Sequence, residues 1–283
     1  MRTDKWDRWR SSAIGIAIRP ICAALAVLSC SLSVKAQTAE APIIAAASVL
    51  QFALADIAEL FKAGTGSTVR VSFGSSGNLA RQIRQGAPFE LFLSADEGFV
   101  LDLFRDGFMR DEGELYALGR MVIFAPHGSP LQADGSLDDL RMAVTDGRVA
   151  RFAIANPEHA PYGQRAQEVL RRRGLWEAIV RKLVLGENVS QAAHFASSTN
   201  TQGGIIAYSL ALSPRVSARG TFALIPDGWH APLRQRMALI KDAGSVAERF
   251  YAFFQRDAAR VILRKYGFVL PHEAGLTKAG VTR

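Results

Sequence analysis

The sequence contains very little cysteine. Among its 283 residues only Cys22 and Cys30 are cysteines, and both precede residue 37. The rest of the chain has no thiol, which excludes a disulfide or a cysteine-ligated metal site from that part. Histidine is scarce as well, with five residues spread along the chain, so the short ligand spacings that are typical of zinc sites are missing.

A strong excess of positive charge is also missing. The formal net charge is +8, but residues 1–36 hold six of the 34 basic and two of the 26 acidic residues, which leaves +4 for the remainder. No basic run is interleaved with aromatic residues, and Arg171-Arg172-Arg173 has the pattern of a solvated helix end. This distribution argues against a nucleic-acid partner.

The N-terminal region has no apolar run long enough to span a membrane comfortably. Ile21–Val34 is apolar but short, residues 1–19 before it are basic and polar, and Val34-Lys35-Ala36 fits a small-residue cleavage pattern. We therefore predict that residues 1–36 are a signal peptide and that the mature protein is exported, to the periplasm in a Gram-negative cell. An uncleaved anchor and a lipoprotein signal at Cys30 are the alternatives.

A turn rich in glycine and serine joins a predicted strand to a predicted helix at residues 74–77. Val69–Phe73 has the composition of a strand, Gly74–Gly77 turns the chain, a short helix through Leu79 and Ile83 follows, and Leu91–Leu93 is the next apolar run. A helix start leaves backbone N–H groups without partners and carries partial positive charge. With no Lys or Arg from residue 73 to 80, this pattern favours a small anion held by neutral donors. The alternative is that its serines only cap the helix.

The same order of elements occurs earlier in the chain. Pro42–Ala47 is an apolar run, Ser48 stands at the expected N-cap position, and apolar residues at helical spacing predict a helix over 49–62. Strands that alternate with helices indicate a parallel sheet of the α/β class. In such sheets ligands bind beyond the carboxyl ends of the strands, where Ser48 and Ser76 would both stand.

The second half of the chain has the same order of strand, turn-rich loop and helix. Residues 151–155 predict a strand, a turn-rich loop over 156–163 follows, and Tyr162 stands at a helix start, where its phenol could donate to an anion. We interpret His159 in that loop as bracing the loop rather than binding a metal. We expect residues 37–119 and 227–271 to form lobe one, residues 120–226 to form lobe two, and residues 272–283 to be a disordered tail.

Several short motifs then complete an ordered set along the chain. They are Ala45-Ala46-Ala47-Ser48, Phe73-Gly74-Ser75-Ser76-Gly77-Asn78-Leu79-Ala80-Arg81-Gln82-Ile83, Gly86-Ala87-Pro88, Leu93-Ser94-Ala95-Asp96, Asn156-Pro157-Glu158-His159-Ala160-Pro161-Tyr162-Gly163 and Lys265-Tyr266-Gly267-Phe268. The set covers nearly all of residues 42–270 and resembles the periplasmic molybdate-binding proteins of ABC transporters (ModA-type).

The resemblance implies a type II periplasmic binding fold, with two α/β lobes and a tetrahedral oxyanion in the cleft between them. It implies a monomeric, non-enzymatic solute-binding protein without a cofactor, which carries molybdate or tungstate to an ABC permease in the inner membrane. Molybdenum would then be present only within the oxyanion. The ligand residues that it implies by position are Ser48, Ser76, Tyr162 and the backbone N–H of Val189.

The sequence departs from the family at one point. Some members place a ligand tyrosine directly after a Gly-Ile-Val run, whereas Gly204-Ile205-Ile206 is followed here by Ala207, and Tyr208 comes one residue late. A shift of one residue on a strand reverses the face of the sheet. We therefore expect Tyr162, rather than Tyr208, to supply the phenol.

Two other functions remain open at this stage. A binding protein for another anion, such as sulfate or a small organic acid, would need the same kind of cleft. A serine-dependent hydrolase could use Ser75 or Ser76 as its nucleophile, although no G-x-S-x-G elbow is present. A ferric-ion site is disfavoured, because these loops lack the clustered tyrosines and carboxylates that it would need.

Overall fold

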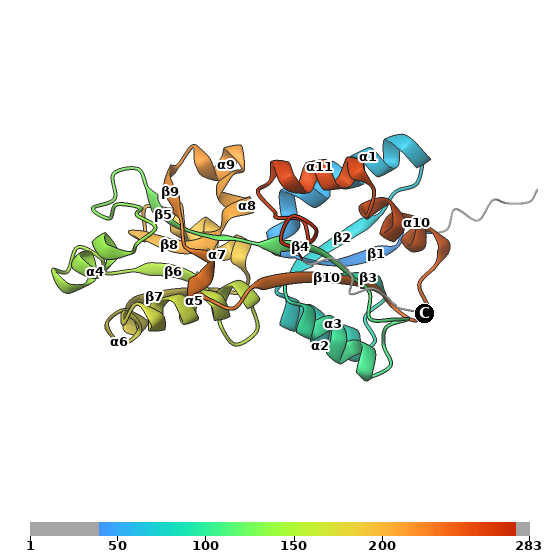
Figure 1. Ribbon diagram of the computed structural model, residues 1–283, viewed down its shortest axis with the longest axis horizontal. Helices are drawn as coiled ribbons and strands as arrows, with labels where there is room; N and C mark the ends of the chain where they lie inside the picture. The colour runs from blue at the N-terminus through green and yellow to red at the C-terminus, as the bar shows by residue number, and fades with distance from the viewer. Residues whose placement is uncertain (1–39, 276–283) are drawn as a thin grey trace, which may run out of the picture. The chain divides into compact units, whose positions relative to one another are not determined.

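The computed structural model describes residues 40–275, so the predicted signal peptide lies outside the described residues, as does all of the predicted tail beyond residue 275. Two five-stranded sheets with helices packed on them make up this part of the chain (Figure 1). The elements in chain order are β1(Ile43–Ala47), η1(Ser48–Leu50), α1(Gln51–Thr65), β2(Arg70–Gly74), α2(Ser76–Arg84), β3(Phe89–Ser94), α3(Glu97–Arg105), β4(Glu114–Gly119), β5(Met121–Pro126), α4(Asp138–Thr145), β6(Phe152–Ala155), α5(Pro161–Arg172), α6(Trp176–Ile179), η2(Val180–Lys182), β7(Leu183–Gly186), α7(Val189–Ala196), β8(Gly203–Ala207), α8(Tyr208–Ala211), α9(Pro214–Ser217), β9(Gly220–Leu224), η3(Asp227–Trp229), β10(Leu233–Leu239), α10(Ser245–Phe254) and α11(Asp257–Lys265).

The first sheet has the strand order β2-β1-β3-β10-β4. Strand β1 runs parallel to β2 and β3, and Ile44 lies opposite Val71 on one side and Leu91 on the other. Strand β10 returns antiparallel to β3 and β4. The carboxyl ends of β1, β2 and β3 therefore share one edge of the sheet, and the chain enters η1, α2 and α3 from that edge.

The second sheet has the order β7-β6-β8-β5-β9 and the same mixed pattern. Strand β6 is parallel to β7 and β8, whereas β5 is antiparallel to β8 and β9. Strand β4 of the first sheet ends at Gly119 and β5 of the second begins at Met121, and the chain returns to the first sheet between β9 and β10. We call the unit around the first sheet lobe one and the unit around the second sheet lobe two.

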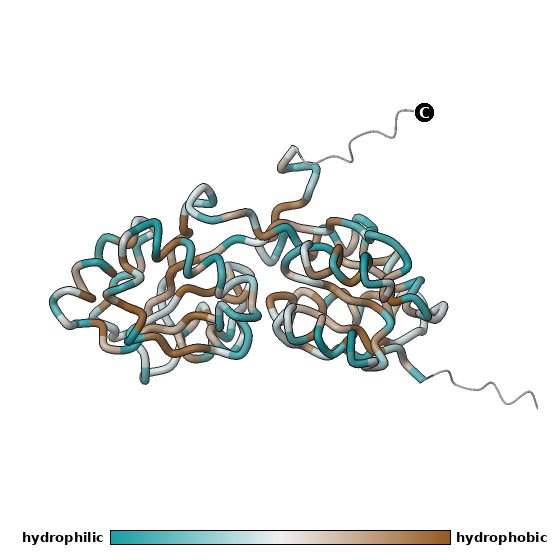
Figure 2. Tube along the Cα trace, turned by 90° about the horizontal axis from the view of Figure 1, so that it is seen from below, coloured by the Kyte–Doolittle hydropathy of each residue, from teal (hydrophilic) through white to brown (hydrophobic). Residues whose placement is uncertain are grey.

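Both faces of the lobe-one sheet are buried. Successive residues of its strands alternate between two apolar clusters: Ile44 and Met237 belong to one, whereas Ala45 and Ala238 belong to the other. Helices α1, α10 and α11 cover the first face, and α2 and α3 cover the second (Figure 1). Figure 2 shows the most hydrophobic segments inside each lobe and hydrophilic segments around them.

An aromatic cluster anchors α1 to α10. The ring of Phe61 meets those of Phe250 and Phe253 edge to face, with centroids 5.0 and 5.4 Å apart. Full burial of such a side chain contributes about 1.5–3 kcal/mol relative to exposure. These contacts fix α1 and α10 against each other on one face of the lobe-one sheet.

The predicted fold class, two α/β lobes, is confirmed, with mixed rather than purely parallel sheets. The predicted N-cap role of Ser48 is wrong: it begins the short helix η1, and neither η1 nor α1 has a side-chain cap bond. The exact lobe boundaries stay a prediction. Within residues 40–275, no helix is both long and apolar enough to cross a membrane.

Candidate functional site

Four helix starts meet at the carboxyl ends of strands from both lobes. Helices η1 and α2 follow β1 and β2 in lobe one, and α5 and α7 follow β6 and β7 in lobe two. A small cavity lies among them, and all four residues predicted to bind the ligand line it. Its lining residues are Ala47, Ser48, Val49, Gly74, Ser75, Ser76, Ala95, Ala160, Pro161, Tyr162 and Val189.

The cavity is very small. Its volume is about 10 Å³, close to the smallest space that holds one water molecule. An oxyanion with four oxygens is larger, so its walls must move apart for such a ligand to enter. The lining comes from both lobes, and a relative movement of the lobes would open it.

Ser76 is fixed by a backbone group of lobe one. Its side-chain oxygen accepts a hydrogen bond from the N–H of Ala95, with 2.9 Å between N and Oγ, and the residue is 1% exposed. A hydroxyl has one proton and two lone pairs. Because the protein occupies one lone pair, the proton of Ser76 stays free to donate to a ligand.

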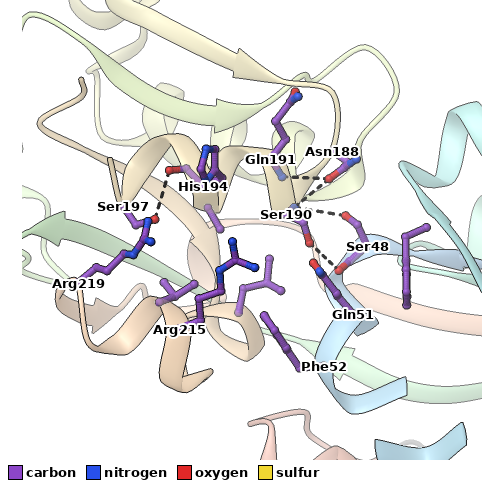
Figure 3. Close-up of a pocket in the computed structure, with 14 residues that line it drawn as sticks. Ser48, Gln51, Phe52, Asn188, Ser190, Gln191, His194, Ser197, Arg215 and Arg219 are labelled. Carbon is purple, nitrogen blue, oxygen red and sulfur yellow. Dashed lines mark hydrogen bonds between the residues drawn. The ribbon is translucent and has the colours of Figure 1, made fainter. Parts of the chain in front are cut away.

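Ser48 is fixed by the opposite lobe. Its Oγ accepts from the N–H of Ser190 at 3.3 Å, and its carbonyl oxygen accepts from Oγ of Ser190 at 2.9 Å (Figure 3). Nearby, Ser209 of lobe two donates to the carbonyl oxygen of Val49 at 3.0 Å. The Ser48 hydroxyl also keeps its proton for a ligand, and these contacts hold the lobes together beside it.

Tyr162 stands at the start of α5 and is 3% exposed. Its phenol oxygen accepts a hydrogen bond from Nε2 of Gln235, 3.1 Å away. Burial raises the pKa of Tyr162 well above its ordinary value, although the hydrogen bond from Gln235 acts in the opposite direction. Tyr162 therefore remains a neutral phenol, which can donate its proton to an anion.

Val189 is the first residue of α7. The side chain of Asn188, the N-cap residue, accepts from the N–H groups of Ser190 and Gln191, at 3.1 Å each. The cap thus serves the second and third residues of the helix. The N–H of Val189 is left for the cavity that this residue lines.

The cavity has no cationic wall. Within residues 40–275, no Lys or Arg is among its lining residues. Arg165, on α5, pairs with Asp96 at 2.8 Å, and Arg236, beside Gln235 on β10, pairs with Glu97 at 3.1 Å. Asp96 also caps α3 by accepting from the N–H of Gly98.

One rim of the cavity is closed by direct contacts between the lobes. Oγ of Ser75 lies 2.8 Å from Nδ1 of His159, and the N–H of Gly77 donates to the carbonyl oxygen of His159 at 2.9 Å. Asn78 donates to Glu187 beside them. A Cβ at position 77 would lie 2.7 Å from that carbonyl oxygen, so only glycine permits this approach. The ring of His159 therefore bridges the two lobes, whereas its interpretation as a brace for its own loop stays a prediction.

A second, larger pocket lies on the other side of Ser48. Its volume is about 410 Å³, and Ser48 and Ser190 line it together with Arg215, Arg219 and His194. Figure 3 shows the guanidinium of Arg215 directed into this space. Both arginines are exposed. Sequence reasoning did not identify this pocket, because α9 contributes only four residues and shows no periodic pattern.

Tyr208 does not reach the small cavity. Its ring packs beneath the guanidinium of Arg120, 4.8 Å from ring centroid to Cζ, and against the edge of Phe222. Among the described residues, those that line the cavity do not include Tyr208. Sequence reasoning also missed Gln235 and Ser190, which orient the predicted hydroxyls, and no motif marks either residue.

Comparison with known proteins places the chain among transport proteins. Residues 43–269 match the family model of the bacterial extracellular solute-binding proteins. The molybdate-binding protein ModA of Rhodobacter capsulatus is 35% identical over 217 residues, which are 76% of this chain and 82% of that protein. ModA of Escherichia coli K12 is 32% identical over 229 residues, 80% of this chain and 87% of that protein. The solved periplasmic molybdate-binding protein of Azotobacter vinelandii aligns with a TM-score of 0.73 and 27% identity, over 81% of this chain and 99% of that one.

Proposed function

Since the chain belongs to the bacterial extracellular solute-binding proteins, and within them to the ModA-type molybdate-binding family, we propose that it captures molybdate outside the cytoplasm. Tungstate, which has nearly the same size and charge, would bind in the same way. The cargo is then handed to an ABC permease in the inner membrane. The oxyanion is the transported ligand, and the protein works without a cofactor.

The observation that carries this proposal is the meeting of four donors at one arginine-free cavity. Ser48, Ser76 and Tyr162 present hydroxyl protons there, and Val189 presents a backbone N–H at a helix start. Burying a dianion is costly unless hydrogen bonds replace its water. Hydrogen bonds to a charged acceptor are the strong ones, and helix starts add favourable partial charge.

This donor set also separates one anion from another. Sulfate is smaller than molybdate, so a shell sized for molybdate leaves longer hydrogen bonds to sulfate. Phosphate at neutral pH carries a proton, which needs an acceptor inside the site. A binding protein for sulfate or a small organic acid remains the second candidate of the same class, and the anion panel below separates it from a molybdate binder.

The contacts between Ser75, His159 and Glu187 raise a catalytic alternative. Oγ of Ser75 is 2.8 Å from the ring of His159, whose Nε2 is 3.6 Å from a carboxylate oxygen of Glu187. Ser75, however, is buried beside a cavity too small for an ester, and Glu187 is largely exposed and also accepts from Asn78. We therefore assign these contacts to lobe closure and propose no catalysis. Turnover of p-nitrophenyl esters that Ser75→Ala abolishes would overturn this assignment.

We propose further that the mature protein acts as a monomer in the periplasm, after removal of residues 1–36, and without a nucleic-acid partner. Size-exclusion chromatography with light scattering, and N-terminal sequencing of the exported protein, test these points directly.

A thermal melting panel tests the proposed ligand. Binding to the native state alone stabilises it by RT ln(1 + [L]/Kd), about 4 kcal/mol at a thousandfold excess over Kd. Residues 37–283 should melt several degrees higher with molybdate or tungstate and little higher with equal sulfate or phosphate. A flat response to all four anions would overturn the proposal, and a response to sulfate alone would favour the second candidate.

A further inference from the structure

We propose that Gln235 is a positioning residue that sets the anion selectivity of the site, by forcing the phenol of Tyr162 to act only as a hydrogen-bond donor. The inference rests on the proposed function, because it concerns the same cavity. It adds residues that do not touch the ligand, Gln235 and Tyr116, and assigns each a role.

The three side chains form a buried chain of hydrogen bonds across the lobes. Gln235 lies in β10 and is 0% exposed. The phenol of Tyr116, on the neighbouring strand β4, is within donating distance of two acceptors, Oε1 of Gln235 at 2.9 Å and the carbonyl oxygen of Ser94 at 3.0 Å. Nε2 of Gln235 donates to the phenol oxygen of Tyr162 at 3.1 Å.

The two ends of a carboxamide are chemically different, and this difference fixes the direction of the proton on Tyr162. Oε1 of Gln235 faces the phenol of Tyr116, and its NH₂ group faces Tyr162 and donates to it. An NH₂ group cannot accept a hydrogen bond. The proton of Tyr162 therefore cannot point toward Gln235, and it is directed to the cavity instead.

The serines of the site are held in the same way. The N–H of Ala95 donates to Ser76, and the N–H of Ser190 donates to Ser48. All three hydroxyls thus receive a hydrogen bond from the protein behind them and offer a proton in front. The groups assigned here to the ligand are all donors, which favours a fully deprotonated tetrahedral dianion over a protonated one such as hydrogen phosphate or hydrogen arsenate.

The backbone at Gly119 leaves room for the hydrogen bond between Gln235 and Tyr162. A Cβ at Gly119 would lie 2.1 Å from the phenol oxygen of Tyr162 and 2.5 Å from Nε2 of Gln235. Any other residue at position 119 would push these two groups apart. Gly119 ends β4, so the strand that carries Tyr116 also provides the space for the Tyr162–Gln235 hydrogen bond.

The decisive variant is Gln235→Glu, which keeps the shape and changes the hydrogen-bonding character. An ionised carboxylate accepts from both phenols, so it would draw the proton of Tyr162 away from the cavity. We expect molybdate affinity, measured by calorimetry at pH 8, to fall about 10- to 100-fold, since hydrogen bonds to charged groups contribute about 1.5–3 kcal/mol and each 1.4 kcal/mol is tenfold. Burial raises the pKa of a carboxyl group, so affinity should recover in part at pH 6, where a protonated group can again donate to Tyr162.

Two controls separate this role from a general loss of structure. Gln255→Glu makes the same change at the residue that follows α10, away from the cavity, and should leave affinity and its pH profile unchanged. In a double-mutant cycle, Gln235→Met should weaken molybdate binding clearly in the parent. In a Tyr162→Phe background the same substitution should weaken binding less than about twofold, because its effect acts through Tyr162.

The outcomes are distinguishable from failure of the proposed function. If the parent binds none of the anions, the proposed function fails. If the parent binds molybdate but Gln235→Glu binds it as tightly as the parent from pH 6 to pH 10, or if the losses of Gln235→Met and Tyr162→Phe simply add, Gln235 does not direct the Tyr162 proton and this inference is overturned.

Discussion

Two cavities share Ser48, and they differ in size, burial and charge. The small one measures about 10 Å³ and is lined by neutral donors, whereas the other measures about 410 Å³ and carries Arg215 and Arg219. Charge alone would direct an anion to the arginines. Exposed charges, however, act through water and salt, which weaken them strongly, whereas buried donors act on a bound anion at close range. The comparison indicates that oriented neutral donors, rather than net charge, make the binding site.

The largest loss of molybdate affinity is expected from a substitution that holds the two lobes apart at the small cavity. In Gly77→Val the new side chain would meet the carbonyl oxygen of His159, 2.7 Å from the Cβ position, and would hold the lobes apart. We expect molybdate affinity in calorimetry to fall by about a hundredfold or more, the cost of several charge-assisted hydrogen bonds. Gly64→Val, where a Cβ meets nothing within 4 Å, is the matched control. Equal affinity in both variants would show that closure at His159 is unnecessary for binding.

The next largest effect should come from removing one donor. Ser76→Ala deprives one anion oxygen of a hydrogen bond, so we expect affinity to fall about 10- to 100-fold, corresponding to about 1.5–3 kcal/mol. Ser245→Ala is the control, because Ser245 also begins a helix, α10, but does not line the cavity. If Ser76→Ala binds as tightly as the parent, the small cavity is not the site.

Substitutions in the large cavity should have a smaller effect on molybdate affinity. Replacing Arg215 and Arg219 together by glutamine should change the equilibrium affinity less than about threefold, since exposed charges contribute little to affinity. The association rate in stopped-flow fluorescence should become less sensitive to salt, because positive surface charge speeds the approach of anions. A loss of affinity as large as that of Ser76→Ala would reverse the roles of the two cavities.

The smallest change in affinity is expected when the pH is raised. A tyrosine of ordinary pKa ionises near pH 10 and then repels an anion, but burial raises the pKa of Tyr162 well above that value. The phenol keeps its proton, so tungstate affinity at pH 10 should stay within about twofold of its value at pH 8. Circular dichroism at both values confirms that the protein remains folded. A steep loss between them, with the fold intact, would show that Tyr162 ionises.

The elements around the small cavity could be predicted because each has a local signal. Apolar runs mark β1, β2 and β6, and Ser48, Ser76 and Tyr162 each stand where a strand gives way to a helix. These residues and Val189 do meet at one cavity, while their role as ligands stays a proposal. The cap predicted for Ser48 was wrong because its partner, Ser190, is 142 residues away. Gln235 escaped notice for the same reason, since its contacts lie 119 and 73 residues away and leave no local pattern.

Anomalous diffraction from crystals grown with tungstate tests the central claim most directly, because tungsten can be located without reference to any expected site. The account predicts one strong peak among Ser48, Ser76, Tyr162 and the N–H of Val189, with no Lys or Arg nitrogen in contact with the anion. A peak held instead by Arg215 and Arg219, with the small cavity empty, would contradict it.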